Sequence, residues 1–171
     1  MPLGRVFVQR CARAEPEDDW EDCECVEAMV DSGAGECVCG PEHFEGTIVM
    51  EDPERPSANT EYVTAGGGRL PNLGEKSVQG LSEEGAPLAI KFQVTNVDKP
   101  LIAVSKLTAA GHEVSFNENG GTITNKASGK TTAFKRKNNV YVLQIWVKRH
   151  RPPSTVAAIR SINQLPGGSR Q

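Results

Sequence analysis

Short apolar segments rich in Val and Ile, separated by turn residues, recur along most of the chain. β-branched residues favour strands, and Gly, Pro and Asn favour the turns between them. The pattern therefore predicts a mostly β protein. The predicted strands are residues 20–30, 37–39, 78–81, 88–94, 112–116, 122–125, 131–134 and 140–147. One short helix is predicted over residues 105–110, because Gly111 follows it at the position where many helices end.

The first predicted strand leads into a small turn that begins with an acidic residue. Asp31 follows the apolar residues 28–30, and the turn continues as Ser32-Gly33-Ala34. An aspartate at the end of a buried strand is partly desolvated, which costs free energy, and function is a common reason for such a cost. Asp31 is therefore the candidate catalytic carboxylate.

The sequence Asp31-Ser32-Gly33-Ala34 resembles the Asp-Ser/Thr-Gly-Ala signature of retropepsin-like aspartic proteases. A second stretch, residues 92–116, resembles the segment that follows the flap in the copia-type retrotransposon branch of that family. In that segment a strand leads to an apolar triplet, a short helix with Ser-Lys-Leu, a glycine and a closing strand. This chain has the same order and spacing, and the resemblance covers residues 20–147.

The resemblance implies a fold: a mostly β, retropepsin-like acid protease monomer with closed, barrel-like antiparallel sheets and one short helix. It also implies that an apolar triplet packs beside the catalytic turn. The corresponding residues are Leu101, Ile102 and Ala103. Retropepsins usually have Gly at the position of Ala103, and copia-type relatives often have Ser there. Alanine is small enough for the close packing that this position requires.

A glycine-rich hairpin is predicted within residues 61–78, where two apolar-bearing arms flank a triple glycine. Glycine at the tip permits positive φ and close approach of another backbone. The hairpin could be an ordinary tight turn. The resemblance implies instead that it is the flap, which closes over a bound peptide. The candidate substrate-binding residues of the flap are Ala65, Gly66, Gly67 and Gly68.

The chain carries a single Asp-Ser/Thr-Gly sequence, whereas aspartic proteolysis needs two carboxylates that face each other. The resemblance therefore implies a homodimer with one Asp31 from each subunit, a peptide or polyprotein substrate bound as an extended strand, and no metal or other cofactor. Ser32 would hydrogen-bond across the twofold axis, and Gly33 and Ala34 would leave room for substrate backbone. The implied activity is that of an aspartic endopeptidase that processes a retrotransposon-type polyprotein.

A second hypothesis keeps this fold without catalysis, as an inactive dimerisation or peptide-binding module. It is motivated by differences from the family pattern at Gly35, Cys37 and Ala103, and by the charged ends of the chain. A fold does not by itself establish an activity, so both hypotheses stand at this point.

The length of 171 residues predicts one domain. We expect it to span residues 20–147, between a poorly ordered segment at 1–19 and a basic tail at 148–171. Residues 15–27 contain eight acidic residues and no basic one, whereas residues 119–171 contain ten Lys or Arg and no acidic one. The two ends could pack together, form unrelated solvated faces or, in the case of the tail, contact nucleic acid. No apolar run is long enough to cross a bilayer, so we expect a soluble, cytoplasmic protein without a membrane partner.

Five cysteines are present, an odd number that argues against a disulfide framework, and we expect reduced thiols. Cys23, Cys25, Cys37 and Cys39 form two Cys-x-Cys pairs that could bind zinc, although zinc sites more often use Cys-x-x-Cys spacing. A cysteine nucleophile with a histidine partner is a further alternative. Nothing near the three histidines marks one of them as a base, and we expect each histidine on the surface.

Overall fold

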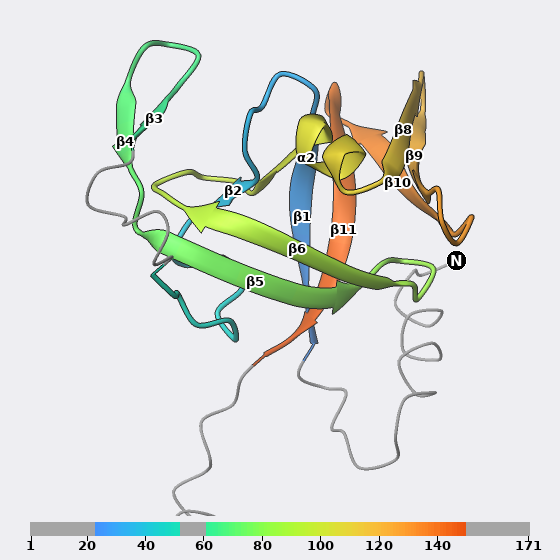
Figure 1. Ribbon diagram of the computed structural model, residues 1–171, viewed down its shortest axis with the longest axis horizontal. Helices are drawn as coiled ribbons and strands as arrows, with labels where there is room; N and C mark the ends of the chain where they lie inside the picture. Colours follow the sequence, from blue (N-terminus) through green and yellow to red (C-terminus); the bar gives the residue numbers. More distant parts are fainter. Residues whose placement is uncertain (1–22, 52–60, 150–171) are drawn as a thin grey trace, which may run out of the picture.

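The computed structural model in Figure 1 describes residues 23–51 and 61–149 of the chain. This part of the protein is mostly β with one short helix, as predicted. The strands are β1 (Cys23–Asp31), β2 (Val38–Cys39), β3 (Glu61–Val63), β4 (Arg69–Pro71), β5 (Gly74–Leu81), β6 (Pro87–Val94), β7 (Leu101–Ala103), β8 (His112–Asn117), β9 (Gly120–Asn125), β10 (Thr131–Lys137) and β11 (Val140–Lys148). The helix is α2 (Val104–Ala109).

The hairpins form where turn residues separate the apolar segments. β5 and β6 pair antiparallel along their full lengths, around a turn in which Gly85 has a φ of 81°. Asn138 and Asn139 join β10 to β11 with φ angles of 51° and 64°, the positive values that a two-residue hairpin turn requires. Gly111, with a φ of 86°, ends helix α2 and starts the chain toward β8.

One nine-stranded sheet contains all strands except β3 and β4, in the order β1-β7-β2-β6-β5-β11-β10-β9-β8. The expectation of purely antiparallel sheets is wrong, because β1 is parallel to β7 and β2 is parallel to β6. The turn after Asp31 reverses the chain, so β1 and β2 run in opposite directions with a gap between them. β7 fills this gap and pairs with both strands, parallel to β1 and antiparallel to β2.

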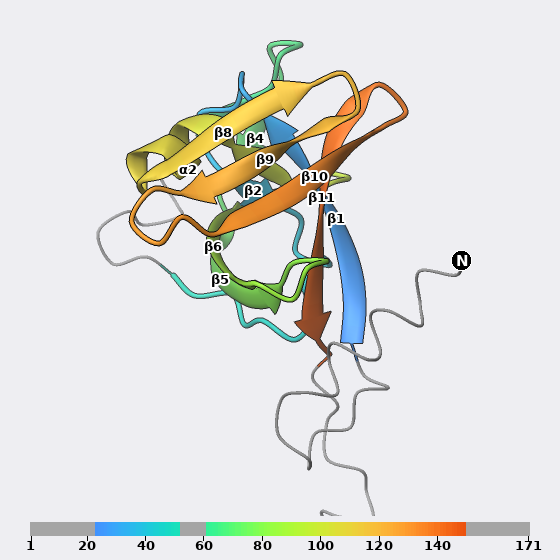
Figure 2. The same ribbon diagram turned by 90° about the vertical axis from the view of Figure 1, so that its right-hand side faces the viewer.

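Strands β8 to β11 form an antiparallel meander, which Figure 2 shows as neighbouring ribbons. β11 extends past the meander and pairs antiparallel with β1, from Cys23↔Lys148 to Met29↔Val142. A single further residue pair joins β11 to β5. The apolar β11 therefore has hydrogen-bonded neighbours on both sides, and it is not the long exposed edge strand that soluble proteins avoid.

The core is built from apolar side chains of nearly every strand of the large sheet. Phe92, Ile102, Leu143 and Ile145 are at most 1% exposed. Phe44, in the segment after β2, packs against this core by stacking on Phe92, with ring centroids 5.1 Å apart. Each such side chain contributes about 1.5–3 kcal/mol through burial. The core thus fixes the relative positions of β1, β2, β6 and β7, which carry the candidate site.

The expected ends of the domain lie close to the first and last residues that the structure describes. The segment at 1–19 and nearly all of the basic tail at 148–171 lie outside them, as do the start of the first predicted strand and residues 52–60. Lys148 ends β11, so this strand continues one residue past the expected domain end at 147. Met50, which lies in none of the predicted strands, forms an isolated bridge with Glu75 of β5.

Candidate active site

Asp31 is the last residue of β1, and a short turn closes on its side chain. The backbone N–H of Gly33 donates a hydrogen bond of 2.7 Å to Asp31 Oδ1. A Cβ at position 33 would lie 3.3 Å from that oxygen, so a larger residue would crowd the carboxylate. Ser32 and Gly33 are exposed and Asp31 is half-buried. The turn therefore presents a carboxylate at the surface from the end of a strand that is anchored in the core.

The short strand β7 holds this turn from the side. Asp31 pairs with Ala103 in the parallel β1–β7 ladder, in which Leu101 and Ile102 face the two preceding residues of β1. Ile102 and Ala103 are fully buried. The N–H of Ala103 donates to Sγ of Cys37 at 3.3 Å, which connects β7 to the far end of the turn. The structure therefore places all three residues of the apolar triplet alongside the candidate catalytic turn.

Helix α2 adds two contacts to the segment that follows the turn. Ser105 Oγ donates to the carbonyl oxygen of Ala34 at 3.3 Å. Lys106 Nζ lies 2.8 Å from Glu36 Oε1. These contacts tie Ala34 and Glu36, in the second half of the 31–37 segment, to a helix that comes about 70 residues later in the chain.

β3 and β4 form a separate two-stranded hairpin that rises beside the Asp31 turn in Figure 1. At its tip the N–H of Gly68 donates to Thr64 Oγ1 at 3.0 Å, and Gly67 has a φ of 80°. Ala65 and Gly66 complete the tip, and all four residues of the predicted flap are exposed. Only backbone and small side chains are thus available to a bound molecule at the tip.

The base of this hairpin is attached to the large sheet by buried polar groups. Asn72 Nδ2 donates to the hydroxyl of Tyr62 and to Gln93 Oε1, both at 3.1 Å. Thr95 Oγ1 donates to the carbonyl oxygen of Pro71 at 2.8 Å. Asn72, Gln93 and Thr95 are at most 6% exposed. The hairpin is therefore fixed at its base and exposed at its tip, an arrangement that suits a segment that closes over a ligand.

A cleft of about 530 Å³ lies between the Asp31 turn and the hairpin, and we call it the cleft below. The residues predicted from sequence that line it are Asp31, Gly33, Ala34, Ala65 and Leu101. Ser32, Gly66, Gly67, Gly68, Ile102 and Ala103 do not line it. The sequence did not lead us to assign the further lining residues to the site: Gly35, Glu36, Val38, Tyr62, Val63, Thr64, Leu70, Thr95 and Val97.

For two of these lining residues, the sequence contained a pattern that could have assigned them to the site. Tyr62 and Leu70 are directly paired across the β3–β4 hairpin, so the same face of the hairpin carries both side chains into the cleft. An apolar residue in each arm of a flap-like hairpin could have been assigned to the site on that basis. Thr95 and Val97 follow β6 and reach the cleft only through the pairing of β6 with β2, which the sequence does not reveal.

A second hollow of about 420 Å³ lies on the other side of Asp31. Ser32 lines it, together with Phe116 and Val140 from the meander. Phe116 is 40% exposed and Val140 36% exposed. Phe116 also makes an edge contact with Tyr141, with ring centroids 4.9 Å apart. Asp31 therefore stands between the cleft and a second, partly apolar concave surface.

The buried cysteines Cys37 and Cys39 do not have the environment of catalytic nucleophiles. Burial raises the pKa of Cys39 to about 11, and burial is also the main cause that raises the pKa of Cys37. Both thiols are therefore protonated at neutral pH, whereas a nucleophilic cysteine needs a lowered pKa. Within residues 23–51 and 61–149, no group of three or more His, Cys, Asp or Glu side chains is arranged to hold a metal ion.

Two histidines differ from the surface positions that we expected. His43 Nδ1 accepts a hydrogen bond from the N–H of Gly40 at 2.8 Å, so its Nε2 carries the proton and can donate to the carbonyl oxygen of Asp98 at 3.1 Å. His43 thus connects the segment after β2 with the segment before β7, and it contacts neither Asp31 nor a cysteine. His112 is half-buried at the start of β8, and His150 lies outside the described residues.

Comparisons with known proteins identified no relative of this chain. A scan against protein-family models, a search of curated proteins and a search of solved structures each returned no match. In the described part of the chain, the helix is too short to span a bilayer. The functional argument therefore depends on the residues and on the geometry of the site.

Proposed function

We propose that this protein is an aspartic endopeptidase that acts as a homodimer, with one Asp31 from each subunit at a shared site. The observation that carries the proposal is the cleft, in which the Asp31 turn faces a glycine-tipped hairpin across a space that fits an extended peptide. Peptide recognition by strand addition uses backbone hydrogen bonds for affinity and alternating pockets for sequence preference. The exposed tip and the apolar side chains of Tyr62 and Leu70 supply both kinds of contact.

The proposed chemistry requires two carboxylates that share one proton. Like charges about 3 Å apart cannot both ionise, so one Asp31 of the dimer is protonated and the other is ionised. The ionised carboxylate takes a proton from a water molecule, whose oxygen then attacks the carbonyl carbon of the peptide. The protonated carboxylate donates its proton to the carbonyl oxygen. The resulting tetrahedral diol breaks its C–N bond when the nitrogen receives a proton, and an amine and an acid are released.

A second carboxylate within one chain is a poor substitute for the partner's Asp31. Glu36 also lines the cleft, but its carboxylate is held in an ion pair with Lys106 of helix α2 at 2.8 Å. In the proposed dimer, Ser32 lies at the axis, and the second hollow with exposed Phe116 and Val140 supplies apolar surface for the contact between subunits. Exposed apolar patches of this kind often mark protein interfaces.

The fold that we propose for each subunit is a closed, retropepsin-like barrel. The pairing of β1 with both β7 and β11 supports it, because the sequence of neighbours β1-β7-β2-β6-β5-β11 then returns to β1. The link between β5 and β11 consists of one residue pair, so closure is weakest there. The proposed substrate class is a polyprotein of the retrotransposon type, as the resemblance of residues 31–34 and 92–116 implies.

The test is a cleavage assay at mildly acid pH with a mixed peptide library, comparing the wild type with Asp31→Asn. We expect the variant to lose activity by about 10²–10⁴-fold, the contribution typical of a general acid or base. Asp98→Asn is the matched control, because Asp98 is the other aspartate in the described residues and does not line the cleft. It should keep wild-type activity.

Protein concentration provides an independent test of the shared site. Specific activity should rise with concentration below the dimer dissociation constant, because a monomer carries one Asp31. A strict monomer in sedimentation that still cleaves peptide in an Asp31-dependent way would refute the shared site. A dimer that cleaves nothing, and that binds a hydroxyl-containing transition-state mimic no better than the parent peptide, would indicate the inactive peptide-binding module instead.

A further inference from the structure

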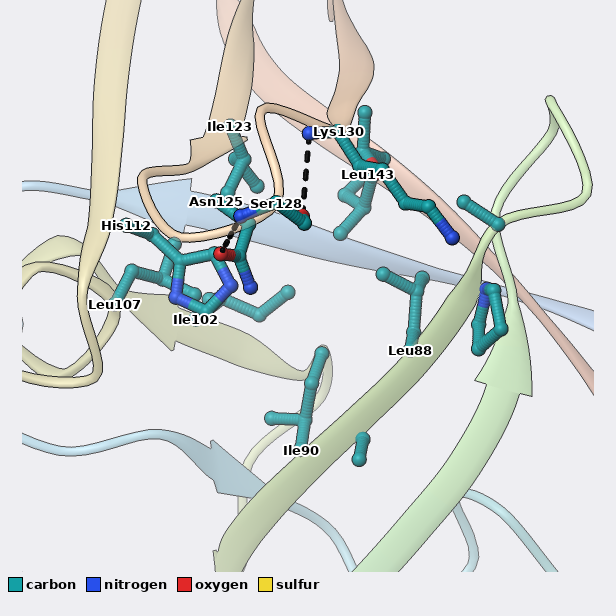
Figure 3. Close-up of a pocket in the computed structure, with 14 residues that line it drawn as sticks. Leu88, Ile90, Ile102, Leu107, His112, Ile123, Asn125, Ser128, Lys130 and Leu143 are labelled. Carbon is teal, nitrogen blue, oxygen red and sulfur yellow. Dashed lines mark hydrogen bonds between the residues drawn. The ribbon is translucent and has the colours of Figure 1, made fainter.

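A smaller cavity, drawn in Figure 3, is lined by Ile102 of β7, whereas the preceding residue, Leu101, lines the cleft. Its volume is about 150 Å³, and it is bounded by β6, β7, helix α2 and the β8–β11 meander. None of its lining residues lines the cleft. The cavity is therefore a separate feature of the subunit, and its role does not depend on the proposed peptidase activity.

The cavity wall combines branched aliphatic side chains with polar ones, among them Ser128, Lys130 and Thr132. Ile102 of β7, Ile123 of β9 and Leu143 of β11 form its buried part, and each is at most 7% exposed. Leu88 and Ile90 of β6 form the opposite wall, as Figure 3 shows. A cavity of about this volume with an aliphatic and aromatic lining remains free of water and binds benzene in another protein. The volume here is thus sufficient for one small molecule, and the aliphatic side chains favour a molecule with an apolar part.

One polar atom in this cavity has no partner. The ring of His112 points into the space in Figure 3, and its Nδ1 is buried without a hydrogen bond to any described residue. The neighbouring Asn125 cannot supply an acceptor, because its Oδ1 already accepts from the N–H groups of Ala127 and Ser128. Buried polar atoms are nearly always hydrogen-bonded, so this nitrogen marks a position where a ligand or a water molecule would be stabilised.

We propose that this cavity binds a small alcohol: a monocyclic aromatic or branched aliphatic molecule of roughly six to eight non-hydrogen atoms with one hydroxyl group. The apolar part fills the space between Ile102, Leu88 and Leu143, and the hydroxyl group hydrogen-bonds to His112 Nδ1. A hydroxyl group suits this nitrogen in either tautomer, because it can donate to an unprotonated Nδ1 and accept from a protonated one. A carboxylate can only accept, so it would suit only the tautomer in which Nδ1 is protonated.

The experiment uses the full chain with ¹³C-labelled methyl groups and ¹⁵N-labelled histidine, titrated with phenol and separately with toluene. The two compounds have the same shape and differ by a hydroxyl in place of a methyl group. We expect saturable shifts of the methyl signals of Ile102, Ile123 and Leu143 with phenol, together with nuclear Overhauser contacts to its ring. The ¹⁵N signal of His112 Nδ1 should move with phenol and stay in place with toluene, even if both bind.

Two variants separate the polar contact from the apolar space. His112→Leu should weaken phenol relative to toluene by about tenfold, the effect of one hydrogen bond. Leu88→Trp places a larger side chain in the cavity and should abolish binding of both compounds while leaving His112 in place. The Nδ1 signal of the wild type tests the same contact without a variant, so the result stands even if His112→Leu does not fold.

Three results would overturn the proposal. The first is the absence of saturable methyl shifts with either compound up to its solubility limit, which would leave a water molecule as the only occupant. The second is a set of shifts outside the cavity residues. The third is an unchanged His112 Nδ1 signal with bound phenol, which would show that the hydroxyl group makes no contact with the histidine.

Discussion

Lys76 provides a sharp test of how the region next to the candidate site is held in place. It lies on β5 and is 2% exposed, although lysine is almost never fully buried without partners. Its Nζ donates to the carbonyl oxygens of His43 at 2.7 Å and Pro41 at 2.8 Å, with Phe44 O at 3.5 Å. A single ammonium group thereby provides hydrogen-bond donors for backbone carbonyl groups of the segment that follows β2. We predict that Lys76→Met destabilises the protein strongly while nearly preserving the side-chain volume.

The magnitude follows from the bonds that are lost. Hydrogen bonds to a charged group contribute roughly 1.5–3 kcal/mol each, so the two short ones together account for about 3–6 kcal/mol. Methionine removes the desolvation cost of the ammonium group, which offsets part of this loss, but the two carbonyl groups remain buried without a donor. The net loss in free energy of unfolding should be about 3–5 kcal/mol. For a chain of this size it corresponds to a fall in Tm of about 6–20 °C.

The measurement is urea-induced unfolding followed by far-UV circular dichroism, at one protein concentration because dimerisation would affect stability. Lys91→Met is the matched control, since Lys91 lies on the neighbouring β6, is 63% exposed and pairs with Glu75 at 3.1 Å. The lysine of this ion pair is exposed, and Glu75 keeps a hydrogen bond of 2.9 Å from Gln93 Nε2 when Lys91 is replaced, so the variant should lose less than about 1 kcal/mol. If the two variants lost stability by the same small amount, the carbonyl contacts of Lys76 would not be the anchor that the structure indicates.

Three further predictions concern the sheet, pH and thiol reactivity. Gly80→Ala should destabilise the protein by about 2 kcal/mol or more, because the added Cβ would lie 2.6 Å from a backbone oxygen of β11. Gly35→Ala is the control, and it should be nearly neutral in the same unfolding assay because no atom lies within 4 Å of its added Cβ. The hydrogen bond from Lys137 lowers the pKa of Glu27. The ionised Glu27 therefore stabilises the folded protein above the ordinary pKa of glutamate, and this stabilisation is lost as pH falls through the lowered pKa. The difference in free energy of unfolding between the wild type and Glu27→Gln should accordingly shrink in acid. Cys39, whose pKa burial raises to about 11, should resist alkylation by iodoacetamide at pH 8 until urea unfolds the chain, and labelling of the native protein at this position would contradict its burial.

The sequence by itself determined the local structure. Alternation of apolar residues and the positions of turn residues predicted most of the strands and the helix before Gly111, because these features depend on φ preferences and side-chain periodicity within a few residues. The acidic turn at Asp31 and the hairpin around Gly67 were visible for the same reason, and both line or border the cleft. β5 was predicted four residues too short, since Gly74 and Lys76 are weak strand formers in isolation.

Only the tertiary structure decided which segments meet. The insertion of β7 between β1 and β2, which makes the sheet mixed, depends on pairing between residues about 70 positions apart, as Val38↔Leu101 and Asp31↔Ala103 show. The same long-range pairing brings Thr95 into the cleft and aims His112 into a separate cavity. It also buries Lys76, a residue that any local pattern assigns to the surface. Such contacts arise from the packing of the whole sheet, and no short window of sequence contains both of the groups that make them.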